Sequence, residues 1–308
     1  MAPPVWMVTG STSGIGAALV NQIITRGDKV IASGRKTEER LGHLKSDNVA
    51  LLDLDITAEW PEMKAKIEQA WETFGHIDVL VNNAGTSSLK SAEDADEAFV
   101  EQIFQVNVFG HMQVTRAILP FFRAQGHGRI GFISSASEWG PIPFMSHYAA
   151  SKAALTTYVE SLHKEASPLG ISCVSFACGG FPTSLGQPRD SGTTGFGSEV
   201  GSIQAYQPLM TEIAGMMMED PMAFMPGDLA KLSTVLVNIL SNEGPEAKLP
   251  WSVNIALGSD AYFMGKKRIE EHLIQLDRWK DVSCSTDRNP GTYTIKERYS
   301  ELISLPEE

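Results

Sequence analysis

The first 26 residues combine three features that limit the fold strongly. Residues 5–9, Val-Trp-Met-Val-Thr, are a short apolar run that predicts a buried parallel strand. A turn with the spacing Gly10-x-x-x-Gly14-x-Gly16 follows, and residues 17–26 predict a helix. Glycines at this place let the backbone approach a diphosphate, and the helix N-terminus offers free N–H groups and partial positive charge. The segment therefore predicts a nucleotide-binding turn, although a glycine-rich surface loop would have the same composition.

The alternation of strand and helix continues along the chain. Apolar runs at residues 29–33, 49–53, 77–81, 129–135, 171–177 and 251–256 predict six further strands. Helical patterns occupy residues 60–74, 92–123, 146–166, 228–240 and 262–279. We therefore predict an α/β single-domain Rossmann fold, with a doubly wound parallel seven-stranded sheet and helices on both faces. The Rossmann domain spans residues 1–260, and residues 261–308 form a C-terminal helical extension and a polar tail.

Composition excludes several function classes. A chain of 308 residues with 43% hydrophobic residues can bury a large core. Its formal net charge of -12 argues against nucleic acid or an anionic membrane as a partner. The three cysteines, without C-x-x-C spacing, and the lack of a leader or apolar span predict a cytoplasmic protein. The seven histidines show no ligand spacing, so we expect no metal.

The residue after the second predicted strand bears on cofactor choice. In a doubly wound sheet this position faces the adenosine ribose, where an acid binds the 2′-hydroxyl and an arginine binds a 2′-phosphate. The sequence here is Gly34-Arg35-Lys36, which has no acid. A charge-assisted contact of about 1.5 to 3 kcal/mol favours NADP(H) over NAD(H) by roughly tenfold to hundredfold. The alternative is that Arg35 is a solvated loop residue.

Tyr148 and Lys152 are the first candidates for chemistry. They lie four residues apart in a predicted helix, so they share one face. A free phenol has a pKa of about 10, and acid–base work near neutrality requires lowering it by roughly 3 units. An ammonium at about 4 Å supplies about 1 kcal/mol in water but about 4 at a protein-like dielectric. The pair therefore suffices only if it is partly desolvated, and a solvated pair is the alternative.

Ser135 ends a predicted parallel strand. A hydroxyl there points into the crevice where open α/β sheets bind ligands, and it can donate to a substrate oxygen. Taken alone, a serine in this serine-rich segment could equally be a turn residue.

Several motifs occur in a set order. They are Thr9-Gly10-x-x-x-Gly14-x-Gly16, Asn82-Asn83-Ala84-Gly85, Asn107 within Val106-Asn107-Val108-x-Gly110, Ser135, and Tyr148-x-x-x-Lys152. Together they resemble the classical short-chain dehydrogenase/reductase family over residues 5–185, and loosely as far as the strand at 251–256. Gly34-Arg35 and Cys178-Gly179-Gly180 are more similar to its NADP-preferring branch, which includes steroid and retinol dehydrogenases.

The resemblance implies hydride transfer between the nicotinamide of NADP(H) and a carbonyl or alcohol carbon. Tyr148 would be the general acid and base, Ser135 would hold the oxygen, and Lys152 would lower the Tyr148 pKa and bind the nicotinamide ribose. Asn107 would support a water relay. The implied cofactor residues are Gly10, Ser11, Ser13, Gly14, Ile15 and Gly16 at the diphosphate, Arg35 at the 2′-phosphate, Asp55 and Ile56 at adenine, Asn83 and Ala84 near the ribose, then Gly85, Gly180, and Thr183 at the carboxamide.

One departure from the family pattern puts the last two assignments in doubt. The family usually has Pro-Gly where this chain has Gly179-Gly180. Loss of proline frees φ, so we expect a looser loop at the nicotinamide end.

The substrate side is predicted from composition. Residues 184–226 are rich in Gly and Ser as far as 202, then rich in Met at 210, 216, 217, 218, 222 and 225. Such a segment could be a lid over a bulky hydrophobic ligand, and core packing or a dimer contact is an equal alternative. We expect five residues to wall the pocket, namely Ser137, Glu138, Trp139, Phe144 and Phe181.

We therefore expect an NADP(H)-dependent carbonyl reductase or alcohol dehydrogenase that acts on a bulky hydrophobic ketone or secondary alcohol. A homo-oligomer, dimer or tetramer, is expected because residues 92–123 carry more apolar face than one layer needs. Two alternatives remain open: an NADP(H)-bound enzyme of a non-redox step (isomerisation, dehydration or cyclisation), or a non-catalytic NADP(H)-sensing protein. The presence of Ser135, Tyr148 and Lys152 weighs against the sensor, since sensing needs only the dinucleotide half.

Overall fold

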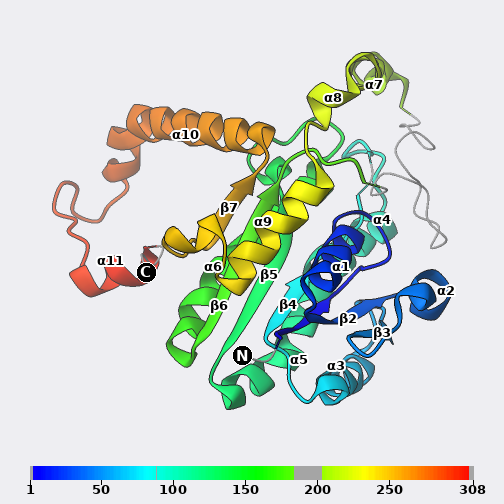
Figure 1. Cartoon of the computed structure of the whole chain (residues 1–308). Helices are drawn as coiled ribbons and strands as arrows, with labels where there is room; N and C mark the ends of the chain where they lie inside the picture. Colours follow the sequence, from blue (N-terminus) through cyan, green and yellow to red (C-terminus); the bar gives the residue numbers. More distant parts are fainter. Residues whose placement is uncertain (1–2, 88, 184–202, 305–308) are drawn as a thin grey trace.

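A seven-stranded sheet, all of whose strands are parallel, forms the centre of the computed structural model, which describes residues 3–87, 89–183 and 203–304. The strand order is β3-β2-β1-β4-β5-β6-β7, which confirms the predicted doubly wound α/β fold (Figure 1). The strands are β1 Val5–Val8, β2 Lys29–Gly34, β3 Val49–Asp53, β4 Val79–Asn82, β5 Gly128–Ser135, β6 Ile171–Cys178 and β7 Asn254–Leu257. The α-helices are α1 Gly14–Arg26, α2 Thr37–Leu41, α3 Trp60–Phe74, α4 Glu97–Phe104, α5 Gly110–Gln125, α6 Ser146–Ala166, α7 Gln207–Glu219, α8 Pro221–Phe224, α9 Leu229–Ser241, α10 Ser259–Ser285 and α11 Glu297–Ile303.

Helices cover both faces of the sheet. On one face, α1 and α9 pack against each other and bury apolar residues such as Leu19 and Leu236. On the other face, α3, α5 and α6 bury residues such as Ile67, Ile118 and Leu155. Burial of apolar surface on both sides explains why the strands are continuous hydrophobic runs rather than alternating ones.

The strand order reverses between β1 and β4, which are neighbours in the sheet although β2 and β3 come between them in sequence. Strands that leave this point in opposite directions open a crevice at their carboxyl ends. The glycine-rich turn follows β1, and the segment Asn83–Gly85 follows β4. The sheet topology therefore brings these two segments to the same edge.

The helical region predicted at 92–123 is two helices with a π-helical turn, Gln105–Phe109, between them. Asn107 lies in this turn and its side chain binds Thr86 on the loop after β4. A π turn inserts one extra residue into the helical repeat, so it cannot be read from the apolar periodicity alone.

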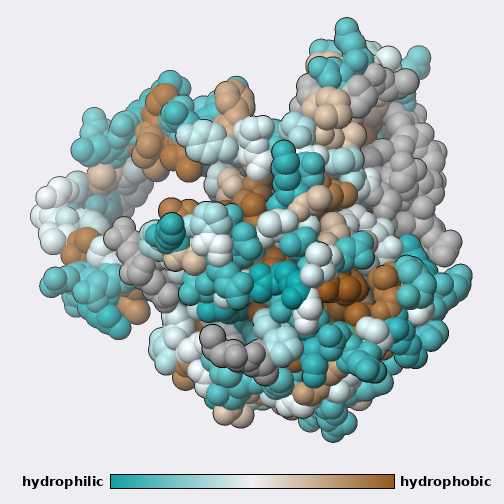
Figure 2. Space-filling view, viewed as in Figure 1, coloured by the Kyte–Doolittle hydropathy of each residue, from teal (hydrophilic) through white to brown (hydrophobic). Residues whose placement is uncertain are grey.

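The helix that follows the last strand is longer than the predicted residues 262–279. Helix α10 begins at Ser259 and runs to Ser285, and the predicted polar tail contains α11. Helices α10 and α11 form an arm, and Figure 2 shows a hollow between this arm and the body of the molecule. Three apolar residues of α10, Ile269, Leu273 and Trp279, are more than half exposed. The Lys164 ammonium on α6 donates to the Ile303 carbonyl at 3.0 Å, which ties α11 to the body.

Among the described residues, no helix combines the length and the apolar character needed to cross a bilayer.

His111 on α5 is a titratable group inside the core. It is fully buried, and neither ring nitrogen has a hydrogen-bond partner of normal geometry among the described residues. Burial, together with the nearby positive charge of Lys152, lowers the pKa of His111 to about 3, and the Ala84 backbone acts in the opposite direction. The imidazole is therefore neutral in the folded protein at all but very acid pH.

This buried imidazole predicts acid sensitivity. Below the pKa of about 6.5 of an unfolded-state histidine, the unfolded chain binds a proton that the folded chain does not, so stability falls with pH. Between about pH 7.5 and 4.5 the wild type should lose about 3 kcal/mol more unfolding free energy than His111→Gln, as measured by urea unfolding. His272→Gln, which changes an exposed histidine on α10, should follow the wild type. Equal losses in wild type and His111→Gln would contradict this account.

Candidate active site

Ser135, Tyr148 and Lys152 meet at the carboxyl edge of the sheet. Ser135 is the last residue of β5, and the other two occupy the first two turns of α6. Tyr148 is 6% and Lys152 4% exposed. The Ser135 side chain acts on the Tyr148 phenol, and the Ser135 hydroxyl accepts from the Ser137 backbone N–H at 3.2 Å. The structure thus brings together the three residues that the sequence motifs singled out.

The electrostatics of Tyr148 differ from the prediction. Burial raises the pKa of Tyr148 to about 12, the hydrogen bond with Ser135 acts to lower it, and Cys178 and Glu138 act to raise it. The Lys152 ammonium lies 5.9 Å from the centre of the Tyr148 ring and donates to the Ile133 carbonyl at 2.8 Å. The expected lowering of the phenol pKa by Lys152 is therefore wrong for this structure, because desolvation of the phenolate outweighs a cation directed elsewhere.

Lys152 is a buried cation at the centre of the site. Burial lowers the pKa of Lys152 to about 8, while Cys178 and Glu138 act to raise it. At neutral pH the ammonium is the protonated form, and its hydrogen bond to Ile133 replaces part of its lost hydration.

The side chain of Asn107 is fully used by protein partners. Its Oδ1 accepts from the Thr86 N–H at 2.9 Å, and its Nδ2 donates to the Thr86 carbonyl at 2.9 Å and to the Ser151 hydroxyl at 3.0 Å. Ser151 in turn donates to the Tyr148 carbonyl at 2.7 Å. Asn107 thereby links the loop after β4 to the first turn of α6, and its part in a water relay stays a prediction.

The glycine-rich turn forms a closed cradle. Gly10 has a φ of +65°, which favours glycine, and the Asn83 Nδ2 donates to the Thr9 and Gly10 carbonyls at 2.8 and 3.1 Å. A Cβ on Gly16 would lie 2.4 Å from that Nδ2. Ser13 precedes α1 and its side chain makes no capping hydrogen bond, so the helix N-terminus stays available. These features fit the diphosphate of a dinucleotide.

The adenosine end of the cradle contains no acid directly after β2. Arg35 is exposed there, and Asp53 is engaged with Thr37, whose N–H and hydroxyl donate to it at 2.6 and 2.7 Å. Asp55 accepts from the Thr57 N–H at 2.9 Å, and Ile56 is buried beside Gly110. The residues predicted around the adenosine thus lie at the ends of β2 and β3.

The loop after β6 is held more firmly than the Gly179-Gly180 sequence predicts. The Gly179 N–H donates to the Leu257 carbonyl at 2.9 Å, and the Gly180 N–H donates to the Asp260 carboxylate at 2.6 Å. A Cβ on Gly179 would lie 2.1 Å from the other Asp260 oxygen. Proline lacks the N–H and carries a Cβ, so the glycine is needed here and the expected loosening is wrong. Thr183 lies beside Gly14, and its place at the carboxamide stays a prediction.

The residues predicted to wall a substrate pocket separate into two groups. Phe144 packs with Met210 and Ile213 of α7, and Ser137 donates to Ser135 at 3.0 Å. The other three are directed elsewhere: Trp139 packs on Gly265 of α10, Phe181 packs on Gly227, and the Glu138 carboxylate accepts from Ser134 and Thr156. These three residues thus have contacts within the fold, and their part in a pocket wall stays a prediction. The predicted lid contributes α7 and α8, and its residues 184–202 lie outside the described part of the chain.

Two features of the site escaped the sequence analysis. Helix α10 contacts both active-site loops, through Asp260 at the β6 loop and Gly265 at the loop after Ser135. A hydroxyl network also connects Glu138, Ser134, Thr156 and Ser175 between β5, β6 and α6. Pairs 80 residues apart, such as Gly180 and Asp260, leave no local pattern in a single sequence. The described residues hold no group of three or more metal-ligand side chains.

Comparison with known proteins agrees with this geometry. Residues 4–193 match the sequence profile described as short chain dehydrogenase. The chain is 26% identical to Oxidoreductase BOA17 of Botryotinia fuckeliana, over 92% of this chain and 98% of that protein. It is 33% identical to the NADPH-dependent 1-acyldihydroxyacetone phosphate reductase of Saccharomyces cerevisiae, over 59% of this chain and 63% of the reductase.

A solved structure extends the likeness to three dimensions. The short-chain dehydrogenase from Streptomyces avermitilis superposes with a TM-score of 0.79 at 30% identity, covering 92% of this chain and 98% of that one. Because the family profile covers more than half of the chain, the protein belongs to the short chain dehydrogenase family, whose members are NAD(P)-dependent oxidoreductases.

Proposed function

We propose that the protein is an NADP(H)-dependent carbonyl reductase or alcohol dehydrogenase that transfers hydride between the nicotinamide and a bulky hydrophobic ketone or secondary alcohol. The observation that carries the proposal is that the Ser135 hydroxyl at the end of β5 and the buried Tyr148 and Lys152 at the start of α6 meet at the carboxyl edge of the sheet. This arrangement suits a carbonyl oxygen that must be held and protonated as its carbon is reduced.

Each side chain has a distinct part in the reaction. The bound cofactor supplies the hydride. Ser135 holds the carbonyl oxygen, and Tyr148 donates its phenolic proton to that oxygen as negative charge develops on it. Since burial raises the pKa of Tyr148 to about 12, the phenol is protonated at neutral pH and ready to act as an acid. Lys152 binds the nicotinamide ribose and places positive charge behind the phenol.

Arg35 supports the choice of NADP(H). It is exposed directly after β2, where a 2′-phosphate would lie, and no acidic side chain follows until Glu38. The relative named an NADPH-dependent reductase agrees with this choice. Planar guanidinium groups bind phosphate through paired hydrogen bonds.

The apolar residues around the site support a bulky hydrophobic substrate. Phe144, Met210 and Ile213 form a buried cluster beside the active-site edge, with Leu89 and Met217 packed against it. The Phe144 ring meets Tyr206 edge-on, with ring centres 6.2 Å apart. Helix α7 also carries exposed apolar residues such as Leu209 and Met216, which are available to an apolar ligand.

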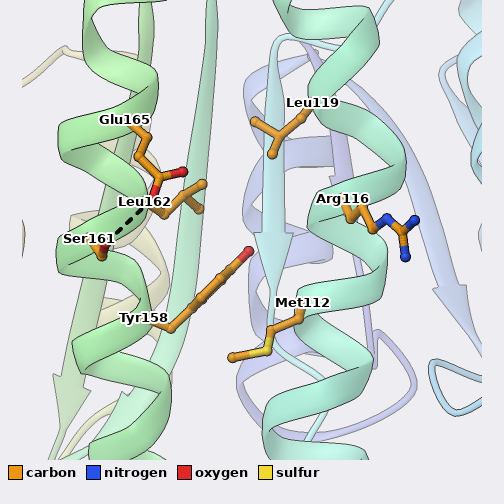
Figure 3. Close-up of a pocket in the computed structure, with 7 residues that line it drawn as sticks. All are labelled: Met112, Arg116, Leu119, Tyr158, Ser161, Leu162 and Glu165. Carbon is orange, nitrogen blue, oxygen red and sulfur yellow. Dashed lines mark hydrogen bonds between the residues drawn. The ribbon is translucent and has the colours of Figure 1, made fainter.

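A homo-oligomer, either a dimer or a tetramer, is also part of the proposal. Figure 3 shows an open groove between the outer faces of α5 and α6. It is lined by Met112, Arg116, Leu119, Tyr158, Ser161, Leu162 and Glu165. None of these is a predicted substrate residue, so the groove suits a second subunit better than the reacting molecule. The buried free thiols of Cys173 and Cys178 support a reducing, cytoplasmic compartment.

The first prediction concerns cofactor choice. Arg35→Asp should weaken NADPH binding roughly tenfold to hundredfold more than NADH binding, because the variant loses a charge-assisted contact to the 2′-phosphate. Fluorescence titration of both cofactors measures the ratio. Arg40→Asp, at an exposed position on α2, is the control for a general change in surface charge. An unchanged ratio in Arg35→Asp would remove the case for NADP(H).

The second prediction concerns the acid. Tyr148→Phe keeps the ring and its burial but removes the proton, so NADPH affinity should persist while NADPH-dependent ketone reduction falls roughly 10²- to 10⁴-fold. Absorbance of NADPH with a panel of apolar ketones reports the rate. Tyr158→Phe, on the same helix but in the outer groove, should keep full activity. Near-normal turnover by Tyr148→Phe would refute the assignment.

A further inference from the structure

Glu138 is a carboxylate placed within the active-site framework. It ends the 3₁₀ turn Ala136–Glu138, which begins directly after Ser135. Its Oε2 accepts from the Ser134 hydroxyl and from the Thr156 hydroxyl, both at 2.6 Å. Its Oε1 is buried and has no hydrogen-bond partner among the described residues. A half-satisfied acid this close to a catalytic serine requires an explanation.

The hydrogen-bond geometry indicates that Glu138 is ionised. Two hydroxyls that converge on one oxygen at 2.6 Å have the short distance of bonds to a charged acceptor. Ser175, 2.9 Å from Thr156, can donate to Thr156 and so leave the Thr156 proton directed at Glu138. A neutral acid would have to carry its proton on Oε1, where it has no acceptor. The network therefore favours the carboxylate, although burial raises the Glu138 pKa.

The same network reaches Lys152. The Ser134 hydroxyl lies 3.3 Å from the Lys152 carbonyl, and Thr156 follows Lys152 by one helical turn on α6. The Lys152 ammonium itself donates to Ile133, the residue before Ser134 on β5. Glu138 and Lys152 are thus hydrogen-bonded to adjacent residues of β5, namely Ser134 and Ile133. Glu138 is also bound by Thr156 of α6, the helix that carries Lys152.

Among the described residues, the other titratable groups around Lys152 are a phenol, a thiol, an imidazole and a carboxylate that is already hydrogen-bonded. Tyr148 on α6 is a neutral phenol, and burial raises the pKa of the Cys178 thiol on β6 to about 12. His111 on α5 is a neutral imidazole with a pKa lowered to about 3. Asp260 at the start of α10 is committed to the Gly180 N–H. Of these groups, Glu138 is the one placed to compensate the buried ammonium.

We propose that Glu138 is a positioning residue whose buried carboxylate, fixed by Ser134 and Thr156, keeps Lys152 in the charged form that binds the nicotinamide ribose. The inference rests on the proposed function, since it assigns Glu138 to the cofactor-binding role of Lys152. An opposite charge in a desolvated site favours the charged form of its neighbour by an amount that water would screen.

Its consequence is a pH limit on cofactor binding. In the free protein the pKa of Lys152 is lowered to about 8, so the ammonium is present below that pH and is lost as the pH rises through it. NADPH affinity should therefore decline above about pH 8 in the wild type. Without the Glu138 charge, the decline in NADPH affinity should begin at lower pH. Burial lowers the pKa of Lys152, and the negative charge that acts against this lowering would be gone.

The test is NADPH affinity measured by fluorescence titration from about pH 6 to 9.5 on wild type and Glu138→Gln. Gln keeps the shape and can accept from both hydroxyls, but it carries no charge. The midpoint of the affinity loss should move down by about 1 pH unit in Glu138→Gln. Glu72→Gln, which removes the same charge from an exposed position on α3, should keep the wild-type midpoint. Thermal unfolding of each variant checks that it is folded.

A second variant covers poor folding of Glu138→Gln. Ser134→Ala leaves the carboxylate in place but removes one of its two donors, so the midpoint should move in the same direction by a smaller amount. NADPH binding with the same midpoint in wild type and both variants would overturn the role of Glu138 alone. Absence of NADPH and NADH binding to the wild type at every pH would overturn the proposed function, and this inference with it.

Discussion

The buried ammonium of Lys152 is the constraint on which the rest of the site depends. A cation that is 4% exposed is tolerated only if its hydration is replaced, and here the Ile133 carbonyl at 2.8 Å supplies one partner. That bond fixes α6 against the carboxyl end of β5 and so sets where Tyr148 stands relative to Ser135. Asn107 and Ser151 hold the same turn of α6 from the side of the π-helical turn. The placement of Tyr148 relative to Ser135 thus depends on the contacts that hold the buried Lys152 ammonium.

Burial also explains the character of the side chains around Lys152. Burial keeps Tyr148, Cys178 and His111 in their neutral forms near neutral pH. A neutral phenol can donate a proton, as the proposed carbonyl reduction requires. Alcohol oxidation requires the phenolate, and the positive nicotinamide of the oxidised cofactor would favour it. The direction of the reaction is therefore expected to follow the cofactor form rather than Lys152 alone.

Much of the fold and the positions of the main site residues could be predicted from the sequence. The alternation of strands and helices predicts a doubly wound parallel sheet, because parallel strands joined by right-handed crossovers leave few topologies. The glycine turn, Ser135, Tyr148 and Lys152 follow from the same logic, since each sits at a strand end or on one helical face. The position of Arg35 after β2 is fixed in the same way.

What could not be predicted depends on burial and on contacts distant in sequence. Spacing suggested that Lys152 would lower the pKa of Tyr148, but spacing does not reveal that the ammonium turns to Ile133. Glu138 was expected to wall the substrate pocket, whereas its carboxylate accepts from hydroxyls on β5 and α6. The requirement for Gly179 appears only when Asp260 of α10 is seen to lie against it.

The most direct test of the central claim, hydride transfer from the cofactor to a ketone, is an isotope experiment. The protein is incubated with NADPH deuterated at nicotinamide C4 and a panel of apolar ketones, and the alcohols are analysed by mass spectrometry. The account predicts an alcohol that carries deuterium on the carbinol carbon, one for each cofactor oxidised; conversion of a ketone with no deuterium gained and no cofactor consumed would contradict it.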